Sequence, residues 1–287
     1  DKAVAEFEDT EEMIKVTESL YGPYRWERYD LLILPPSFPF GGMENPRLSF
    51  ITPTVIVGDK SLVSLIAHEL AHSWSGNLVT NASWKDMWLN EGFTSYVENR
   101  IVEALYGKPR ADMEFVISRN GLLDQLKELP AERQVLVLPM RGGSDPEDAL
   151  GAVAYDKGAW FLQFLELRFG RELFDPFLRA WFDQHAFQSA TSEQFLAFLE
   201  SELMAKQPDA VSREEVLSHD GTKVSVITAL APPPSSAARR SLFQPRRCAV
   251  SSISTFCQGR IIALYSVLNP EKLGAAVTGL RTGASLQ

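Results

Sequence analysis

The sequence predicts an α+β fold that is mainly helical, with a small mixed sheet near the N-terminus. Two observations indicate this fold class. Short segments bounded by Pro and Gly fill much of the first 57 residues, which is typical of strands and tight turns. From Asp59 onward, the apolar residues recur about every 3.6 positions, the period of a helix. The change of period places the sheet before the helices.

Each element follows from local signals. Residues 10–20 form an amphipathic helix that Gly22 and Pro23 terminate. Strands are expected at residues 29–34, 48–51 and 54–57, with a turn at 39–42. A helix then begins near Asp59, which can cap it, and ends at Gly76. Later helices are predicted at residues 110–127, 155–169, 172–185 and 192–203.

The composition excludes several classes of protein. The 287 residues are 45% hydrophobic and 23% charged, so collagen-like and wholly disordered chains are excluded. A net charge of -9 argues against a nucleic-acid-binding surface. No apolar run approaches the roughly 18 residues that span a bilayer. The two cysteines, Cys248 and Cys257, cannot form a disulfide framework. We expect a cytoplasmic protein, and the sequence leaves its oligomeric state open.

The charge divides the chain at about residue 217. Residues 218–287 contain eight basic and two acidic side chains, whereas residues 1–217 contain 20 and 35. The C-terminal part also holds a Pro-Pro-Pro-Ser-Ser run, residues 232–236. We therefore expect a folded domain at 1–217 and a basic, poorly ordered tail at 218–287. Because the chain opens on Asp1 rather than Met, we interpret it as part of a longer polypeptide.

The main motif is His68-Glu69-Leu70-Ala71-His72. Residues four apart share a helical face, so His68 and His72 project together and can bind one Zn²⁺. Glu69 lies about 100° round the helix, where it can act as a general base without being a ligand. The alternative is a core helix that carries two histidines by chance. Only four His occur in the chain, which favours the metal site.

A catalytic zinc site needs a third protein ligand, and Glu91 is the candidate. It follows His72 after eighteen intervening residues, on a helix that Ser83 and Asp86 begin as a capping box. Gly107 and Pro109 end that helix. Glu98 lies on the same face, seven residues on. It either orients a ligand imidazole or is an ordinary solvated charge.

These motifs together resemble a known family. The pattern H-E-x-x-H with a Glu eighteen residues later, in Asn90-Glu91-Gly92, resembles the gluzincin aminopeptidases, and Gly42-Met43-Glu44-Asn45 matches their G-x-M-E-N motif. Residues 29–32, 34–39 and 67–81 are similar to the branch of leukotriene A-4 hydrolase and aminopeptidase B. The likeness covers about residues 1–205. It implies a thermolysin-like catalytic domain with one Zn²⁺ per chain.

The resemblance also implies roles for individual residues. Tyr155, in a context like the family's Y-E-K-G with Asp156 in place of Glu, would donate to the oxyanion of the reaction. Without the resemblance, a Tyr that only packs by its ring would be the favoured alternative. Glu44 would bind the α-ammonium group of a peptide with a free N-terminus. The neighbouring residues would contact the substrate: Phe40, Gly41, Gly42, Met43 and Asn45.

Departures from the family leave alternatives open. The flanking domains of the family are not evident in this sequence, and Leu150 and Gly151 replace an aromatic residue and a Ser near Tyr155. The favoured function is a zinc aminopeptidase, with peptides as partners and neither nucleic acid nor a membrane span. One alternative is a truncated chain that binds zinc without turnover. The other is a lipid epoxide hydrolase of the leukotriene A-4 hydrolase type.

Overall fold

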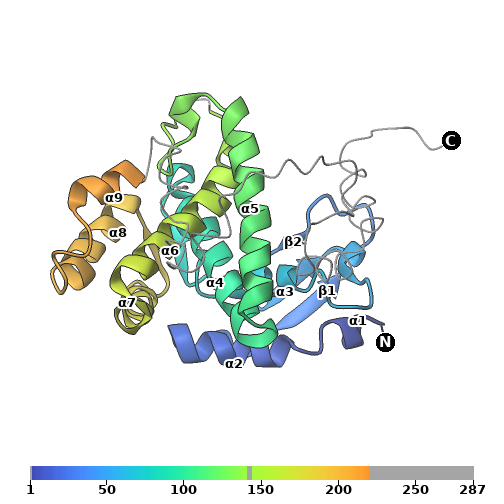
Figure 1. Ribbon diagram of the computed structural model, residues 1–287. Helices are drawn as coiled ribbons and strands as arrows, with labels where there is room; N and C mark the ends of the chain where they lie inside the picture. Colours follow the sequence, from blue (N-terminus) through green and yellow to red (C-terminus); the bar gives the residue numbers. More distant parts are fainter. Residues whose placement is uncertain (1, 141–143, 220–287) are drawn as a thin grey trace, which may run out of the picture.

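A computed structural model describes residues 2–140 and 144–219 (Figure 1). The predicted tail, residues 218–287, lies outside the described residues except for its first two, which end helix α9 (Arg213–His219). The prediction of a mainly helical fold with a small mixed sheet near the N-terminus is confirmed. None of the helices in the described ranges has the length and apolar character needed to cross a membrane.

The N-terminal segment begins with α1 (Lys2–Glu6) and α2 (Thr10–Tyr21). As predicted, α2 ends at Gly22, whose φ of 99° suits glycine. Glu6 is buried and accepts hydrogen bonds from the backbone N–H groups of Gly58 and Lys60, at 2.6 and 2.9 Å. The first helix therefore holds the loop that leads to the H-E-x-x-H helix.

A three-stranded mixed sheet follows. Strand β3 (Leu48–Ile51) lies in the middle, parallel to β1 (Asp30–Ile33) and antiparallel to β2 (Gly42–Met43). The prediction of a further strand at residues 54–57 is wrong. A 3₁₀ turn, η1 (Pro53–Val55), occupies this position, because Pro53 fixes the φ of a helical first residue and Thr52 caps it.

The H-E-x-x-H helix, α3 (Ser64–Ala71), begins later than predicted. Asp59 does not cap it: its Oδ1 accepts a hydrogen bond from the N–H of Ser61, 3.1 Å away, and so forms a local turn. His72 is the C-cap residue and keeps helical φ and ψ values of -57° and -19°. The two histidines therefore remain on one face, although the helix ends before Gly76.

Helix α4 (Trp88–Tyr106) runs through the middle of the fold (Figure 1). Residues 88–94 are all buried, which means that every face of its first two turns is covered. A 3₁₀ turn, η2 (Trp84–Asp86), precedes it. The predicted capping box at its start is wrong, because the Ser83 hydroxyl donates to the Asp86 carboxylate, at 2.7 Å, rather than capping the backbone.

The remaining helices follow α4 in the chain. Helix α5 (Lys108–Glu128) starts directly after Gly107, with Pro109 in its first turn. The short turns η3 (Ala131–Arg133) and η4 (Pro146–Ala149) lead to a π-helical turn, η5 (Val153–Lys157), and α6 (Gly158–Phe169). The chain ends its described part with α7 (Arg171–Gln184), α8 (Ser192–Leu199), the π-helical η6 (Glu200–Met204) and α9. Between α7 and α8, strand β5 (Gln188–Ala190) pairs in parallel with β4 (Val79–Asn81).

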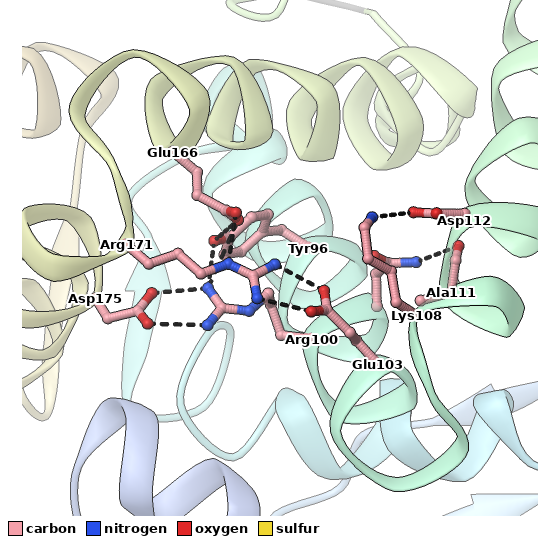
Figure 2. A network of polar contacts seen from close by, with 10 residues as sticks. Tyr96, Arg100, Glu103, Lys108, Ala111, Asp112, Glu166, Arg171 and Asp175 are labelled. Carbon is pink, nitrogen blue, oxygen red and sulfur yellow. Dashed lines mark hydrogen bonds and ion pairs between the residues drawn. The ribbon is translucent and has the colours of Figure 1, made fainter. Parts of the chain in front are cut away.

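A buried polar network joins α4 to α6 and α7 (Figure 2). Arg100 donates to both carboxylate oxygens of Asp175, at 2.7 and 2.9 Å, and the hydroxyl of Tyr96 donates to Glu166 at 2.6 Å. Arg171 bridges Glu166 and Glu103 at 2.7 Å each. Because Arg100 lies nine residues after Glu91, it faces the opposite side of α4. This network anchors the back of the helix that carries Glu91.

Candidate metal centre

Helices α3 and α4 bring the three predicted metal ligands together. One ligand atom each from His68, His72 and Glu91 lies within 4.8 Å of the others. The Oε2 atom of Glu91 is 3.3 Å from His68 Nε2 and 3.4 Å from His72 Nε2. His72 and Glu91 are buried, and His68 is partly exposed. The sequence spacing therefore predicted a real cluster, formed where α3 packs against α4.

The far side of each imidazole fixes its tautomer. His68 Nδ1 is 2.9 Å from Glu98 Oε2, and His72 Nδ1 is 3.0 Å from the carbonyl oxygen of Ser75. Both partners are acceptors, so each Nδ1 carries a hydrogen and each neutral ring presents a lone pair at Nε2. Of the two alternatives for Glu98, the structure supports the one that orients an imidazole.

When both rings are neutral, as metal ligands must be, three acceptors converge on one point. Glu91 Oε2 is buried and has no hydrogen-bond partner among the described residues, although both Nε2 atoms are near. A buried carboxylate oxygen facing two nitrogen lone pairs is unfavourable unless a cation lies between them. Two imidazoles and one carboxylate are also a donor set that Zn²⁺ accepts in sites with an open position. The residues fit a zinc ion.

Glu69 lies beside this cluster and not within it. Its side chain is buried, and its Oε2 has no hydrogen-bond partner in the described part of the chain. Burial raises the pKa of Glu69 to about 7, against the opposing effect of the two histidines. Ligand atoms of Glu44, Glu69 and His72 lie within 4.8 Å of one another, so Glu44 also reaches the site.

The predicted glycines allow the sheet to approach Glu69. A Cβ on Gly42 would lie 2.1 Å from Glu69 Oε1, closer than any side chain tolerates. Gly41 accepts a hydrogen bond from the N–H of Thr52, at 2.9 Å. The backbone of β2 therefore passes directly over the side chain of Glu69, as a strand paired on one edge by β3.

Tyr155 lies on η5, so the predicted helix from residue 155 begins two residues earlier, as a π-helical turn. Its ring is nearly parallel to that of His68, with centroids 5.9 Å apart and an angle of 13°. Burial, followed by the nearby Glu91 carboxylate, raises the pKa of Tyr155 above its ordinary value. The hydroxyl therefore stays protonated at neutral pH and is a hydrogen-bond donor.

The other predicted substrate residues lie around β2. Phe40 is 59% exposed and contacts the ring of Phe38, with centroids 5.8 Å apart. Met43 is also exposed, and its carbonyl accepts a hydrogen bond from the N–H of Asn45 at 3.0 Å. The role of Phe40 in a side-chain pocket stays a prediction. Leu150 and Gly151 line a small cavity together with Trp84, Met87, Gln125 and Ala154.

Some residues of the site carried no signal in the sequence. The hydroxyl of Thr94 is 3.1 Å from His72 Nδ1 and 2.6 Å from the hydroxyl of Ser75. Gly76, with a φ of +108°, leaves room for the His72 ring and for Asn90, because a Cβ would lie 3.0 Å from His72 Nδ1 and 2.6 Å from Asn90 Oδ1. The H-E-x-x-H pattern does not identify these contacts, which depend on how α3 and α4 pack.

Comparison with known proteins agrees with this geometry. Residues 5–216 match the model of the peptidase family M1 domain. The chain belongs to peptidase family M1. The predicted peptidase fold and the class of metallopeptidase are thereby confirmed at the level of the family. The relatives described next confirm the branch of leukotriene A-4 hydrolase and aminopeptidase B.

Several M1 proteins are similar to this chain. Leucine aminopeptidase 2 of Yarrowia lipolytica is 48% identical over 203 residues, which are 68% of this chain and 31% of that protein. Leukotriene A-4 hydrolase of Xenopus laevis is 47% identical over 69% of this chain and 33% of its own. Aminopeptidase B of Rattus norvegicus is 47% identical over 66% of this chain and 29% of that protein. The chain thus spans about a third of the length of these relatives.

Solved structures show the same fold. Yeast LTA4 hydrolase in complex with bestatin has a TM-score of 0.74 and 36% identity, over 81% of this chain and 37% of that chain. An M1 zinc metallopeptidase variant of Deinococcus radiodurans, bound to a Tyr-Ser-Ala substrate, has a TM-score of 0.59 and 25% identity, over 74% and 43%. The expectation of a Zn²⁺ cofactor is confirmed at the level of the family.

Proposed function

We propose that this M1 domain, residues 1–217, is a zinc-dependent aminopeptidase, with His68, His72 and Glu91 as the ligands of one Zn²⁺. The convergence of the two imidazole Nε2 atoms on a buried carboxylate oxygen, which has no hydrogen-bond partner among the described residues, carries this proposal. A zinc ion so held supplies Lewis-acid chemistry to a hydrolysis. The third ligand, on a different helix from the other two, makes the site depend on the packing of α3 against α4.

Glu69 is the general base of the proposed reaction. It accepts a proton from the attacking water and returns it to the leaving nitrogen of the peptide bond. Its position supports this role, because it is adjacent to the ligands, buried and free of a hydrogen-bond partner on Oε2 among the described residues.

Tyr155 is the proposed donor to the carbonyl oxygen of the scissile bond, where negative charge develops. Its ring packs beside His68, and its hydroxyl keeps its proton at neutral pH. A neutral donor near the metal ligands can stabilise that charge in a site from which water is largely excluded.

Glu44 is proposed to select peptides with a free N-terminus. An α-amine has a reference pKa of about 7.7–8.0 and is largely a cation at neutral pH. A carboxylate oxygen of Glu44 lies within 4.8 Å of a carboxylate oxygen of Glu69 and of a ring nitrogen of His72, so Glu44 can pair with this cation beside the metal. The open edge of β2 at Gly41, Gly42 and Met43 can pair with the peptide backbone, with Phe40 and Asn45 flanking it.

Turnover of a free and an N-acetylated aminoacyl-anilide tests the proposal. The zinc-loaded chain should cleave the free substrate, and the acetylated one should be poor. Glu69→Gln should retain zinc and lose about 10²–10⁴-fold in kcat. Glu44→Ala should lose about 2–5 kcal/mol of transition-state stabilisation for the free amine. Glu12→Gln, on the exposed face of α2, is the control and should be unchanged.

The same assay separates the alternatives. Full zinc content without turnover would support a truncated zinc-binding chain. Equal cleavage of free and acetylated substrates would indicate an endopeptidase and would remove the role of Glu44. Hydrolysis of a lipid epoxide, without cleavage of the anilide, would favour the epoxide hydrolase. The cytoplasmic location stays a prediction.

A further inference from the structure

The turn that carries Tyr155 is held by hydrogen bonds of the two residues that follow it. Asp156 Oδ1 accepts a hydrogen bond from the hydroxyl of Ser118 on α5, at 2.6 Å. The Lys157 ammonium group donates to the carbonyl oxygen of Gln134, in the loop after α5. The two residues that follow Tyr155 are therefore both bonded to other parts of the fold.

Both hydrogen bonds connect η5 to helix α5, one directly through Ser118 and the other through Gln134. Gln134 Nε2 donates to the carbonyl oxygens of Leu126 and Leu129, at 3.0 and 2.8 Å, and so caps the C-terminal end of α5. Ser118 lies in the middle of α5. Helix α5, which carries none of the proposed ligands or catalytic groups, therefore helps to position η5.

The opposite side of η5 rests on α4 through a contact without side chains. A Cβ on Gly92 would lie 2.7 Å from Gly158 Cα and 2.8 Å from the carbonyl oxygen of Ala154. Gly92 directly follows Glu91. The Tyr155 turn is thus fixed between α4, which carries a proposed metal ligand, and the hydroxyl of Ser118.

The Ser118 bond matters because it is made to a buried charge. Burial raises the pKa of Asp156 to about 6, and Ser118 opposes this effect by stabilising the carboxylate. Glu98 repels the charge and His68 attracts it. At neutral pH, Asp156 is ionised and partly buried, so loss of a donor leaves a carboxylate that must move toward water or another partner. Such a movement would displace its neighbour Tyr155.

We propose that Ser118 is a positioning residue: its hydrogen bond to Asp156 fixes the η5 turn so that the Tyr155 hydroxyl meets the developing oxyanion. The inference rests on the proposed function, and it deepens it by naming a residue on a helix outside the site. Tyr155 touches the reacting atoms, and Ser118 acts only through Asp156. A side chain that merely stabilised α5 would change the melting temperature without changing the reaction.

The test compares Ser118→Ala with Ser118→Thr in the zinc-loaded full chain. Ser19→Ala is the matched control, because the Ser19 hydroxyl makes a local hydrogen bond on α2, to the carbonyl oxygen of Val16. Three quantities are measured: kcat and KM for an aminoacyl-anilide, the affinity for an aminophosphinic dipeptide that mimics the tetrahedral state, and the affinity for the free amino acid. Zinc content is measured for every variant.

Ser118→Ala should lower kcat about tenfold, equivalent to about 1.4 kcal/mol, with KM within about twofold. Affinity for the phosphinic dipeptide should fall by the same factor, while affinity for the amino acid and the zinc content stay unchanged. Ser118→Thr keeps the hydroxyl and should restore kcat. A kcat for Ser118→Ala equal to that of Ser19→Ala would overturn the inference. So would equal losses of affinity for both ligands.

The proposed function can fail separately. If the wild-type chain holds zinc but neither turns over the anilide nor binds the phosphinic dipeptide, the aminopeptidase proposal is wrong and the role of Ser118 falls with it. If the wild type binds the dipeptide without turnover, its affinity in the variants still decides the role of Ser118. If the wild type cleaves the anilide and the Ser118 variants have the same kcat and affinities as Ser19→Ala, the inference about Ser118 is wrong and the proposed function stands.

Discussion

Glu98 Oε2 lies 2.9 Å from His68 Nδ1, seven residues along α4 from Glu91. One helix thus supplies both a proposed metal ligand and the group that orients another ligand. The bond holds the His68 ring so that Nε2 faces Glu91. His72 is oriented differently, by the carbonyl oxygen of Ser75 and the hydroxyl of Thr94. The two imidazoles therefore depend on separate supports.

Removal of the Glu98 carboxylate should weaken zinc binding. Partners of this kind typically contribute about 10–100-fold in metal affinity, so Glu98→Ala should raise the zinc dissociation constant by that factor. Glu98→Gln should lose less, because its amide oxygen can still accept from His68. Competition with a chromogenic chelator measures both constants. Glu128→Ala, an exposed change on α5, serves as the control; equal affinity in all three variants would contradict the role of Glu98.

The glycine contact between α4 and α6 should not tolerate a methyl group. A Cβ on Gly158 would lie 2.8 Å from Gly92 Cα, and backbone cannot give way cheaply. Gly158→Ala should therefore cost about 1–3 kcal/mol in the free energy of unfolding. Gly121→Ala on α5 meets nothing within 4 Å and should be neutral or stabilising by up to about 1 kcal/mol. Urea unfolding compares them, and equal stability would show that the contact is not tight.

Removal of Arg100, the buried cation of the network behind α4, should cause a large loss of stability. Arg100→Met leaves the carboxylate of Asp175 without its two hydrogen bonds from the buried guanidinium, which should cost about 3–5 kcal/mol. Lys127→Met breaks an exposed pair with Asp124 and should cost less than about 1 kcal/mol. Chemical unfolding of both variants gives the comparison. A cost for Arg100→Met as small as that for Lys127→Met would refute the importance of the network.

Titration of the Asp156 carboxyl should make the free energy of unfolding depend on pH. The pKa of its carboxyl is about 6 in the folded state, raised by burial from 3.8. Between pH 4 and 6 the folded state therefore holds a proton that the unfolded state has released, so this group lowers stability as pH rises. Asp156→Asn does not titrate, and its amide oxygen can still accept from Ser118.

The zinc-free chain is suited to this measurement, because a nearby cation would itself lower the pKa of Asp156. The free energy of unfolding of Asp156→Asn, minus that of the wild type, should grow by about 2–3 kcal/mol from pH 4 to pH 7. Both chains share every other titrating group, so those contributions largely cancel. A difference that stays constant over this range would contradict the buried position of the carboxylate.

The ligand cluster could be predicted because much of its signal lies in a short stretch of sequence. Four residues separate His68 from His72, and helical geometry alone puts them on one face. Glu91 came from its spacing together with the resemblance to a family. The beginning of α3 was mispredicted, since Asp59 can close a turn as well as cap a helix, and only the packing of the loop against Glu6 decides between them.

Other parts of the site depend on contacts that no periodicity encodes. Thr94 reaches His72 from a helix 22 residues away, and Ser118 reaches Asp156 across 38 residues. The π-helical form of η5 likewise has no simple signature, because its residues also suit an α-helix. Such contacts are set by the way α4, α5 and η5 pack around one another, and this packing became visible only in the structure.

Zinc content after dialysis is the most direct test of the central claim, that His68, His72 and Glu91 form one metal site. The wild-type chain should retain about one zinc ion, because three protein ligands with one open position are typical of a catalytic site. His72→Ala removes one ligand and should retain almost none. His185→Ala, a change at a histidine that packs on Trp181 away from the cluster, should retain the full amount. A full equivalent of zinc in His72→Ala would contradict the account.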